Sequence, residues 1–116
     1  MDRRANLRIQ KDFLGLLYIG ADEYAVRILD VSEDGMAFSV DDPVNLDIYD
    51  RITVTVYEKY TTVCDDEKVF SGNVQAHIKN IIPLENGSVR YGCTVNDIKF
   101  FDYVQEQYVA LSCKSR

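Results

Sequence analysis

Residues 51–57 alternate strictly between polar and apolar side chains. The apolar members, Ile52, Val54 and Val56, fall on one side of an extended chain, and the polar members fall on the other side. Because the segment repeats every second position and is rich in β-branched residues, it predicts a half-buried β-strand. The chain is therefore expected to be built on a sheet with one face turned to a core.

Five further segments have the composition of short strands, and turn residues separate them. The sequence predicts strands at residues 13–19, 24–29, 36–40, 69–82 and 88–95. Gly15 is expected to form a bulge in the first of these strands. Asn86-Gly87 is the strongest local signal for a hairpin. Pro43 ends the predicted strand at residues 36–40, because proline cannot donate a hydrogen bond to a sheet.

The periodicity changes near the C-terminus. Asn96 or Asp97 can cap a helix, and a helix is predicted at about residues 97–113. Four apolar residues recur there at helical spacing and are expected to pack on the sheet: Phe101, Val104, Tyr108 and Leu111.

Six short antiparallel strands followed by one amphipathic helix indicate a small barrel or a strongly curled sheet. Closure is the usual way for such a chain to remove its edges. The expected fold class is therefore all-β with a C-terminal helix, a six-stranded antiparallel β-barrel. The 116 residues accommodate one domain, in which residues 1–11 are expected to form a flexible basic arm and residues 12–116 the barrel with its helix.

Composition narrows the class of protein. No apolar run approaches the roughly 20 residues of a membrane span, and the N-terminus lacks the apolar core of a signal peptide. The three cysteines are widely spaced and odd in number, which favours reduced thiols in a cytoplasm over a disulfide framework. We therefore expect a cytoplasmic protein without a membrane partner.

The net charge of −6 is distributed unevenly. Residues 1–11 carry four cationic side chains against one acidic side chain, a net charge of +3, so the other 105 residues carry −9. A body this acidic repels a long polyanion, and DNA or RNA is not an expected partner. The basic segment can still hold a small anion, although a solvated terminus is the more ordinary role of such a stretch.

Catalysis finds little support in the sequence. The single histidine, His77, lies within a predicted strand, and no nucleophile–base arrangement or glycine-rich phosphate loop accompanies it. The acidic pairs Asp41-Asp42 and Asp65-Asp66 fall in turns and are expected to be solvated charges. We therefore expect no enzyme activity, no catalytic residues, no metal site and no cofactor.

Two short motifs have complementary chemistry. Arg4-x-x-x-Arg8 supplies two guanidinium groups that suit phosphates and the O6/N7 edge of guanine. Asp30-x-Ser32-x-x-Gly35 supplies acceptors for the N–H donors of guanine. The second motif is expected to be a solvent-exposed turn, in which Asp30 and Ser32 bond backbone amides and Gly35 adopts a positive φ.

Together, the two motifs resemble the signature of the PilZ domain, a bacterial receptor module for cyclic di-GMP. The gap of 22 positions from Arg8 to Asp30 is similar to that of the family, and Tyr91-Gly92-Cys93 followed by a helix resembles its C-terminal end. The family fold is a six-stranded antiparallel barrel with a C-terminal helix. The chain departs from the family at Met36, where a second glycine is frequent, and in its acidic body, which does not favour a dianionic ligand.

The resemblance implies roles for individual residues. Arg4 and Arg8 would clamp the guanines and phosphates of cyclic di-GMP, and Arg3 would add a further contact. The residues that would hold a guanine edge and the adjacent phosphate are Asp30, Ser32 and Gly35.

The expected function is a cyclic di-GMP receptor or adaptor that passes the level of this second messenger to a protein effector by ordering its N-terminal arm. Motility, adhesion and exopolysaccharide machinery are all open as effectors. The alternative is a PilZ-like interaction adaptor that binds no nucleotide. A third possibility, a small nucleic-acid-binding barrel, would need a basic face that the acidic body does not offer.

Overall fold

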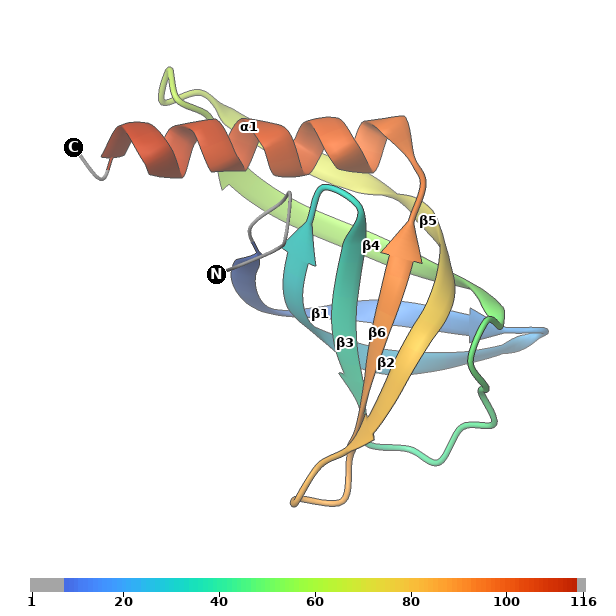
Figure 1. The fold of residues 1–116 in the computed structure, drawn as a ribbon. Coiled ribbons are helices and arrows are strands. Elements are labelled where there is room, and N and C mark those ends of the chain that lie inside the picture. The colour runs from blue at the N-terminus through green and yellow to red at the C-terminus, as the bar shows by residue number, and fades with distance from the viewer. Residues whose placement is uncertain (1–7, 115–116) are drawn as a thin grey trace.

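The structure is a computed structural model that describes residues 8–114, with side chains up to Ser112. Within this range the chain forms six strands and one helix (Figure 1). The elements are β1 (Ile9–Ile19), β2 (Asp22–Ser32), β3 (Gly35–Val40), β4 (Arg51–Thr61), β5 (Glu67–Pro83), β6 (Val89–Val95) and α1 (Ile98–Lys114). In residues 8–114 no helix has the length and apolar character needed to cross a membrane.

The six strands form a closed antiparallel barrel in the order β1-β2-β3-β6-β5-β4, as the sequence predicted. Hairpins join β1 to β2, β2 to β3, β4 to β5 and β5 to β6, whereas β3 pairs with β6 instead of its successor β4. The ring closes where β1 pairs with β4, from Leu16↔Thr55 to Tyr18↔Thr53. Each of the six described strands thus has two neighbours in the ring.

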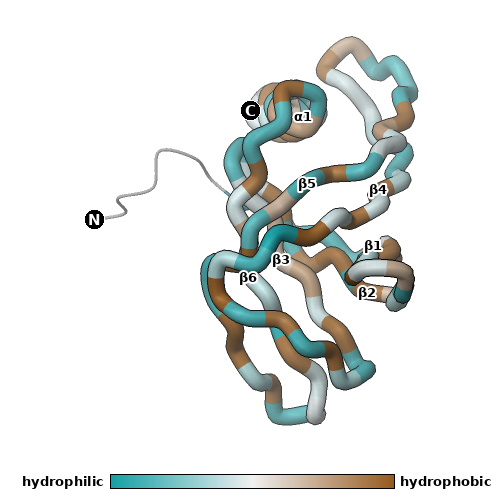
Figure 2. Tube along the Cα trace, turned by 90° about the vertical axis from the view of Figure 1, so that its right-hand side faces the viewer, coloured by the Kyte–Doolittle hydropathy of each residue, from teal (hydrophilic) through white to brown (hydrophobic). Residues whose placement is uncertain are grey.

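Alternating side chains fill the barrel. On β4 the predicted inward residues Ile52, Val54 and Val56 are buried, and on β5 Val74 and Ile78 are buried likewise. Figure 2 shows the resulting alternation of hydrophobic and hydrophilic residues along the strands. The period-two pattern that predicted the strands therefore also identifies which of their residues form the core.

Three register shifts interrupt the ladders, and none lies at Gly15. Gly15 is in regular register with Val26, so the predicted bulge at this glycine is wrong. The shift in β1 lies between Gln10 and Phe13, and similar shifts occur between Ile28 and Asp30 in β2 and between Ile78 and Asn80 in β5. A glycine at position 15 instead allows close approach, because a Cβ there would lie 3.0 Å from the carbonyl oxygen of Thr55.

Several strands extend beyond their predicted boundaries. β1 begins at Ile9 rather than Phe13, and β2 continues to Ser32 rather than ending at Leu29. The boundary predicted at residue 11 between arm and barrel thus falls inside β1. The Asn86-Gly87 hairpin lies where predicted, with Gly87 at a φ of 91°.

Helix α1 lies across one end of the barrel (Figure 1). Its buried residues are Phe100, Tyr103, Val104, Gln107 and Ala110. The ring of Tyr103 stacks on Phe70 of β5 with 4.4 Å between centroids.

The predicted buried face of the helix is partly wrong. Phe101 is 40% exposed and Leu111 is 51% exposed, whereas Val104 is buried as expected. Because the aromatic contacts of Phe100 and Tyr103 with Phe70 set the rotation of the helix, the face that meets the barrel is displaced by about one residue from the one that the spacing indicated.

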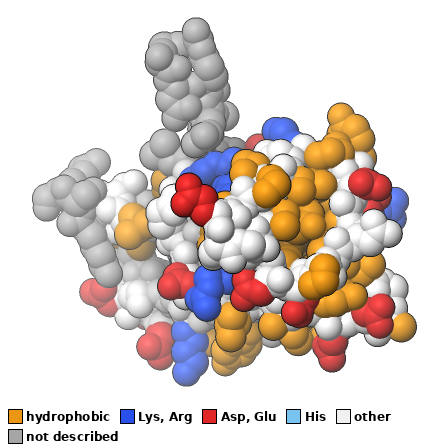
Figure 3. Space-filling view, turned by 90° about the horizontal axis from the view of Figure 1, so that it is seen from below, with side chains coloured by type: hydrophobic (Ala, Val, Ile, Leu, Met, Phe, Trp, Pro, Cys, Tyr) orange, Lys and Arg blue, Asp and Glu red, His pale blue; other side chains and the backbone are white. Residues whose placement is uncertain are grey.

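Several large apolar side chains remain on the outside of the barrel wall. Leu14 of β1 is 65% exposed and Tyr57 of β4 is 57% exposed. Hydrophobic side chains also gather on the face that Figure 3 presents. Apolar surface of this kind is common on small proteins.

Asp97, and not Asn96, caps the helix in the structure. The carboxylate oxygen Oδ1 of Asp97 accepts a hydrogen bond from the amide of Phe100 at 3.0 Å. We therefore expect Asp97→Ala to lower the free energy of unfolding by about 1 kcal/mol, measured by urea denaturation. The matched variant Asn96→Ala should leave stability unchanged, and equal losses in the two variants would contradict this assignment.

Candidate functional site

The bulge in β2 determines where Asp30 lies. Before the bulge the buried apolar residues are Val26 and Ile28, at even positions, and after it the core residue is Val31, at an odd position. Because adjacent strand residues point to opposite faces, Asp30 lies on the face opposite Val31. Strict alternation would have placed this carboxylate among the core residues. The bulge therefore re-aims Asp30 out of the barrel interior.

Asp30 is enclosed by two arginines. Its side chain is only 7% exposed, and its Oδ1 lies 2.7 Å from Nη1 of Arg8. Its second oxygen, Oδ2, lies 3.0 Å from Nη2 of Arg90 on β6. Two cations thus share one buried carboxylate, which leaves the cluster with one net positive charge. A cluster of this charge can attract an anion.

The contact between Arg8 and Asp30 joins the two sequence motifs. Gln10 of β1 is the strand partner of Asp30, so Arg8, two residues earlier in the chain, comes close to that carboxylate. Arg3 and Arg4, the other predicted arginines of the arm, lie outside the described residues. Arg8 is therefore the member of the arginine motif whose position the structure gives.

Ser32 has a different environment from the one expected. Its hydroxyl lies 3.0 Å from a carboxylate oxygen of Asp34 and 3.5 Å from the carbonyl oxygen of Gly35. Both Asp30 and Ser32 are buried rather than exposed, and the hydrogen-bond partners of their side chains are arginines, a carboxylate and a carbonyl oxygen rather than the expected backbone amides. The reason is that the turn is confined to Glu33 and Asp34, so both residues belong to β2.

Position 35 needs a glycine because β3 and β6 approach each other closely there, and not because of the φ angle. Positive φ among the described glycines occurs at Gly20 and Gly87, so the expected positive φ at Gly35 is wrong. A Cβ at position 35 would lie 2.6 Å from the carbonyl oxygen of Cys93 on β6. Met36, which follows in place of a second glycine, is buried in the core.

Arg90 is a site residue that the sequence did not indicate. The residue lies in a predicted strand without a recognisable motif, and it is 60 positions away from Asp30 in the sequence. It approaches Asp30 because β3 pairs with both β2 and β6. Only the non-sequential strand order brings the two residues together, and a single sequence contains no signal for it.

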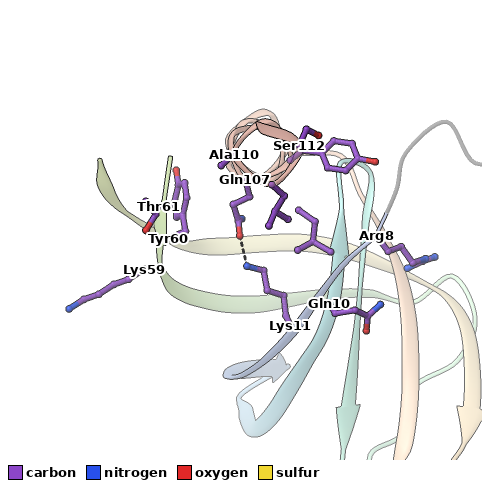
Figure 4. A pocket seen from close by; sticks show the side chains of 12 residues that line it. Arg8, Gln10, Lys11, Lys59, Tyr60, Thr61, Gln107, Ala110 and Ser112 are labelled. Carbon is purple, nitrogen blue, oxygen red and sulfur yellow. Dashed lines mark hydrogen bonds between the residues drawn. The ribbon is translucent and has the colours of Figure 1, made fainter. Parts of the chain in front are cut away.

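A pocket of about 790 Å³ opens between the start of β1, the end of β4 and the last turns of α1 (Figure 4). Arg8 lines it from just before β1, Lys11 from β1, Lys59 from β4 and Gln107 from α1. Arg8 therefore borders both this pocket and the Asp30 cluster. Of the three cationic side chains at the pocket, Arg8 is paired with Asp30 and Lys11 is paired with Glu58.

Lys11 connects the start of β1 to the helix. Its ammonium lies 2.9 Å from Oε1 of Glu58 and donates to the side-chain oxygen of Gln107 (Figure 4). Tyr103 donates its hydroxyl hydrogen to the same glutamate. Burial, followed by this hydrogen bond, raises the pKa of Tyr103 above its ordinary value, so the phenol stays protonated and remains a donor at physiological pH.

No metal centre is evident in the described part of the chain, where no three His, Cys, Asp or Glu side chains are grouped to hold an ion. The acidic pairs Asp41-Asp42 and Asp65-Asp66 are exposed. His77 is exposed on β5.

A side chain at position 35 should disrupt the junction of β3 and β6. We expect Gly35→Ala to lower the free energy of unfolding by about 1–3 kcal/mol, because its Cβ would overlap a backbone oxygen that cannot move without breaking the ladder. Gly72→Ala is the matched control, since a Cβ there meets only Phe70 Cζ at 3.9 Å. Denaturant melts of both variants test this, and a stable Gly35→Ala variant would contradict it.

Thiol reactivity should report whether this junction is closed. Burial raises the pKa of the Cys93 thiol to about 12, whereas Cys64 is exposed. Because the thiolate is the reactive form, we expect Cys64 to react with a disulfide reagent at pH 8 and Cys93 to react only after unfolding. The measurement uses a Cys113→Ser background, so that two thiols remain. Rapid modification of both thiols in the native protein would show that the junction opens.

Two solved structures have a fold similar to that of this chain. The inhibitor of motility MotI/DgrA of Bacillus subtilis superimposes with a TM-score of 0.74 at 11% sequence identity, over 99% of this chain and 53% of that one. The chain therefore spans about half the length of MotI/DgrA. The PilZ domain of YcgR from Escherichia coli, solved with c-di-GMP, has a TM-score of 0.66 at 16% identity, over 99% of this chain and 95% of that one.

Comparison by sequence gives the family. A search of curated proteins found no significant match. The PilZ domain model, however, matches residues 2–104, which include both motifs and all six strands. Members of this family are regulatory receptor and adaptor domains related to cyclic di-GMP. The resemblance seen in the two motifs is therefore confirmed over most of the sequence, and the chain belongs to the PilZ domain family.

Proposed function

We propose that the protein is a cytoplasmic receptor for cyclic di-GMP that has no catalytic activity and acts through a protein effector. The observation that supports this proposal is the contact of Arg8 with Asp30, because it unites one residue of each ligand-binding motif at a single site. The cluster has one net positive charge, and the ligand has two phosphates. Electrostatic attraction therefore favours binding despite the acidic body.

Ligand binding is proposed to proceed by exchange of partners. Arg8 leaves Asp30 and binds a phosphate or the O6/N7 edge of a guanine, as a guanidinium does well. The freed Oδ1 of Asp30 then accepts from the N1–H or N2–H group of a guanine. Arg4, and in a further contact Arg3, complete the clamp. Ser32 and Gly35 border the adjacent phosphate.

The output is proposed to be the repositioning of residues 3–8 over the Asp30–Gly35 segment. A ligand held between arm and barrel creates a surface that did not exist before, and an effector protein recognises it. Machinery for motility, adhesion or exopolysaccharide synthesis supplies candidate effectors. One of the two similar structures is an inhibitor of motility and the other is a PilZ domain with c-di-GMP, which is consistent with such a role.

One observation favours the alternative, a constitutive adaptor that binds no nucleotide. Asp30 already has a cationic partner on each oxygen, so the site is electrostatically satisfied without ligand. Binding must therefore compete with an existing ion pair. The two hypotheses differ in one measurable quantity, which is the affinity of the protein for cyclic di-GMP.

Isothermal titration calorimetry with cyclic di-GMP, and GTP as the control ligand, distinguishes these hypotheses. Saturable binding at micromolar or lower concentration is expected for cyclic di-GMP only. The stoichiometry decides between one ligand and a stacked pair. Absence of heat at high protein concentration would reject the receptor and favour the adaptor.

The arginine clamp has its own test. The double variant Arg4→Ala/Arg8→Ala should lose binding by about 100-fold or more, since each charge-assisted contact contributes about 1.5–3 kcal/mol. Circular dichroism should show an intact barrel. The matched control Arg27→Ala/Arg51→Ala removes the same charge from exposed positions and should retain affinity. Wild-type affinity in the first variant would reject the clamp.

A further inference from the structure

We propose that Arg90 is a positioning residue for Asp30, which keeps this carboxylate neutralised and oriented while Arg8 is transferred to the ligand. The inference rests on the proposed function, because it concerns the same site. It adds a residue that belongs to neither sequence motif and assigns different roles to the two arginines that contact Asp30. Arg8 is the exchangeable partner, and Arg90 is the permanent one.

The two ion pairs differ in their backbone support. Arg90 lies inside β6, where it pairs with Ser39 of β3 on one side and with Ile82 of β5 on the other. Its backbone is therefore held by two ladders. Arg8 precedes the first residue of β1, and its side chain is 36% exposed against 25% for Arg90. The backbone of Arg8 can move away from Asp30 without breaking a ladder, and the backbone of Arg90 cannot.

The two arginines contact different oxygens of the Asp30 carboxylate, and this arrangement fits their proposed roles. Arg8 binds Oδ1 at 2.7 Å, and Arg90 binds Oδ2 at 3.0 Å. Departure of Arg8 thus frees one oxygen for a guanine donor, while the other oxygen stays bound and fixes the plane of the carboxylate. The ligand meets an acceptor that is already oriented, which lowers the entropic cost of binding.

Removal of Arg90 has a clear physical consequence. Asp30 is 7% exposed, and a buried carboxylate without a cationic partner is strongly disfavoured. In a variant without Arg90, the transfer of Arg8 to the ligand would leave Asp30 in that state. Arg8 would therefore stay with Asp30, and the affinity for ligand would fall although Arg90 does not touch the ligand.

The experiment is a double-mutant cycle measured by calorimetric titration with cyclic di-GMP. It uses the wild type, Arg90→Gln, Asp30→Asn and the double variant, with circular dichroism and thermal melts to show that each is folded. Arg90→Gln should weaken binding about tenfold or more. In the Asp30→Asn background the same change should have little further effect, because no carboxylate remains to be positioned.

Two further variants serve as controls. Arg90→Lys keeps the charge and should restore part of the affinity, which loss of fold would not explain. Arg27→Gln removes an arginine that pairs with Asp12 on the surface and should have no effect on binding.

The outcomes separate this inference from the proposed function. Wild-type affinity in Arg90→Gln, with the wild type itself binding, would overturn the inference alone. Equal losses from Arg90→Gln with and without Asp30 would also overturn it, since they would indicate direct contact of Arg90 with the ligand. Failure of the wild type to bind cyclic di-GMP would overturn the proposed function together with the inference.

Discussion

Closure of the sheet between β1 and β4 is the contact on which the other features depend. It consists of a short ladder centred on Leu17↔Val54, and a glycine at position 15 lets the strands approach. Without it, both strands would be edges with unpaired backbone groups. β1 also positions Arg8 beside Asp30 and Lys11 beneath the helix. β1, the strand that closes the barrel, therefore also brings Arg8 to the candidate site through its pairing with β2.

The fold could be predicted from the sequence to a large extent, because period-two alternation and hairpin signals are local. Residues 51–57 and the Asn86-Gly87 turn are clear examples. The rotation of α1 could not be predicted, since helical spacing alone does not distinguish Phe100 from Phe101 at the barrel surface. That choice depends on the stacking of Tyr103 on Phe70, a contact between residues distant in sequence.

The candidate site was predictable in its residue types but not in its geometry. The motifs identified Arg8, Asp30 and Ser32, yet they gave no sign that the carboxylate and hydroxyl would be buried. The bulge after Ile28 turns Asp30 out of the barrel interior, where Arg8 and Arg90 cover it, and the extension of β2 places Ser32 within the sheet. Arg90 was missed because it reaches Asp30 through the β3–β6 pairing. The site is thus a property of the strand order as much as of the motifs.

The pocket beside α1 has a practical consequence for handling the protein. Arg8, at the start of the described chain, and Ser112, near its end, line the same opening. A label attached close to Arg8 or to Ser112 would therefore lie at this opening, beside the arginine that contacts Asp30. The β5–β6 hairpin around Gly87 projects from the opposite end of the barrel (Figure 1). Exposed loop tips accept insertions well, so a reporter placed there would leave the opening unobstructed.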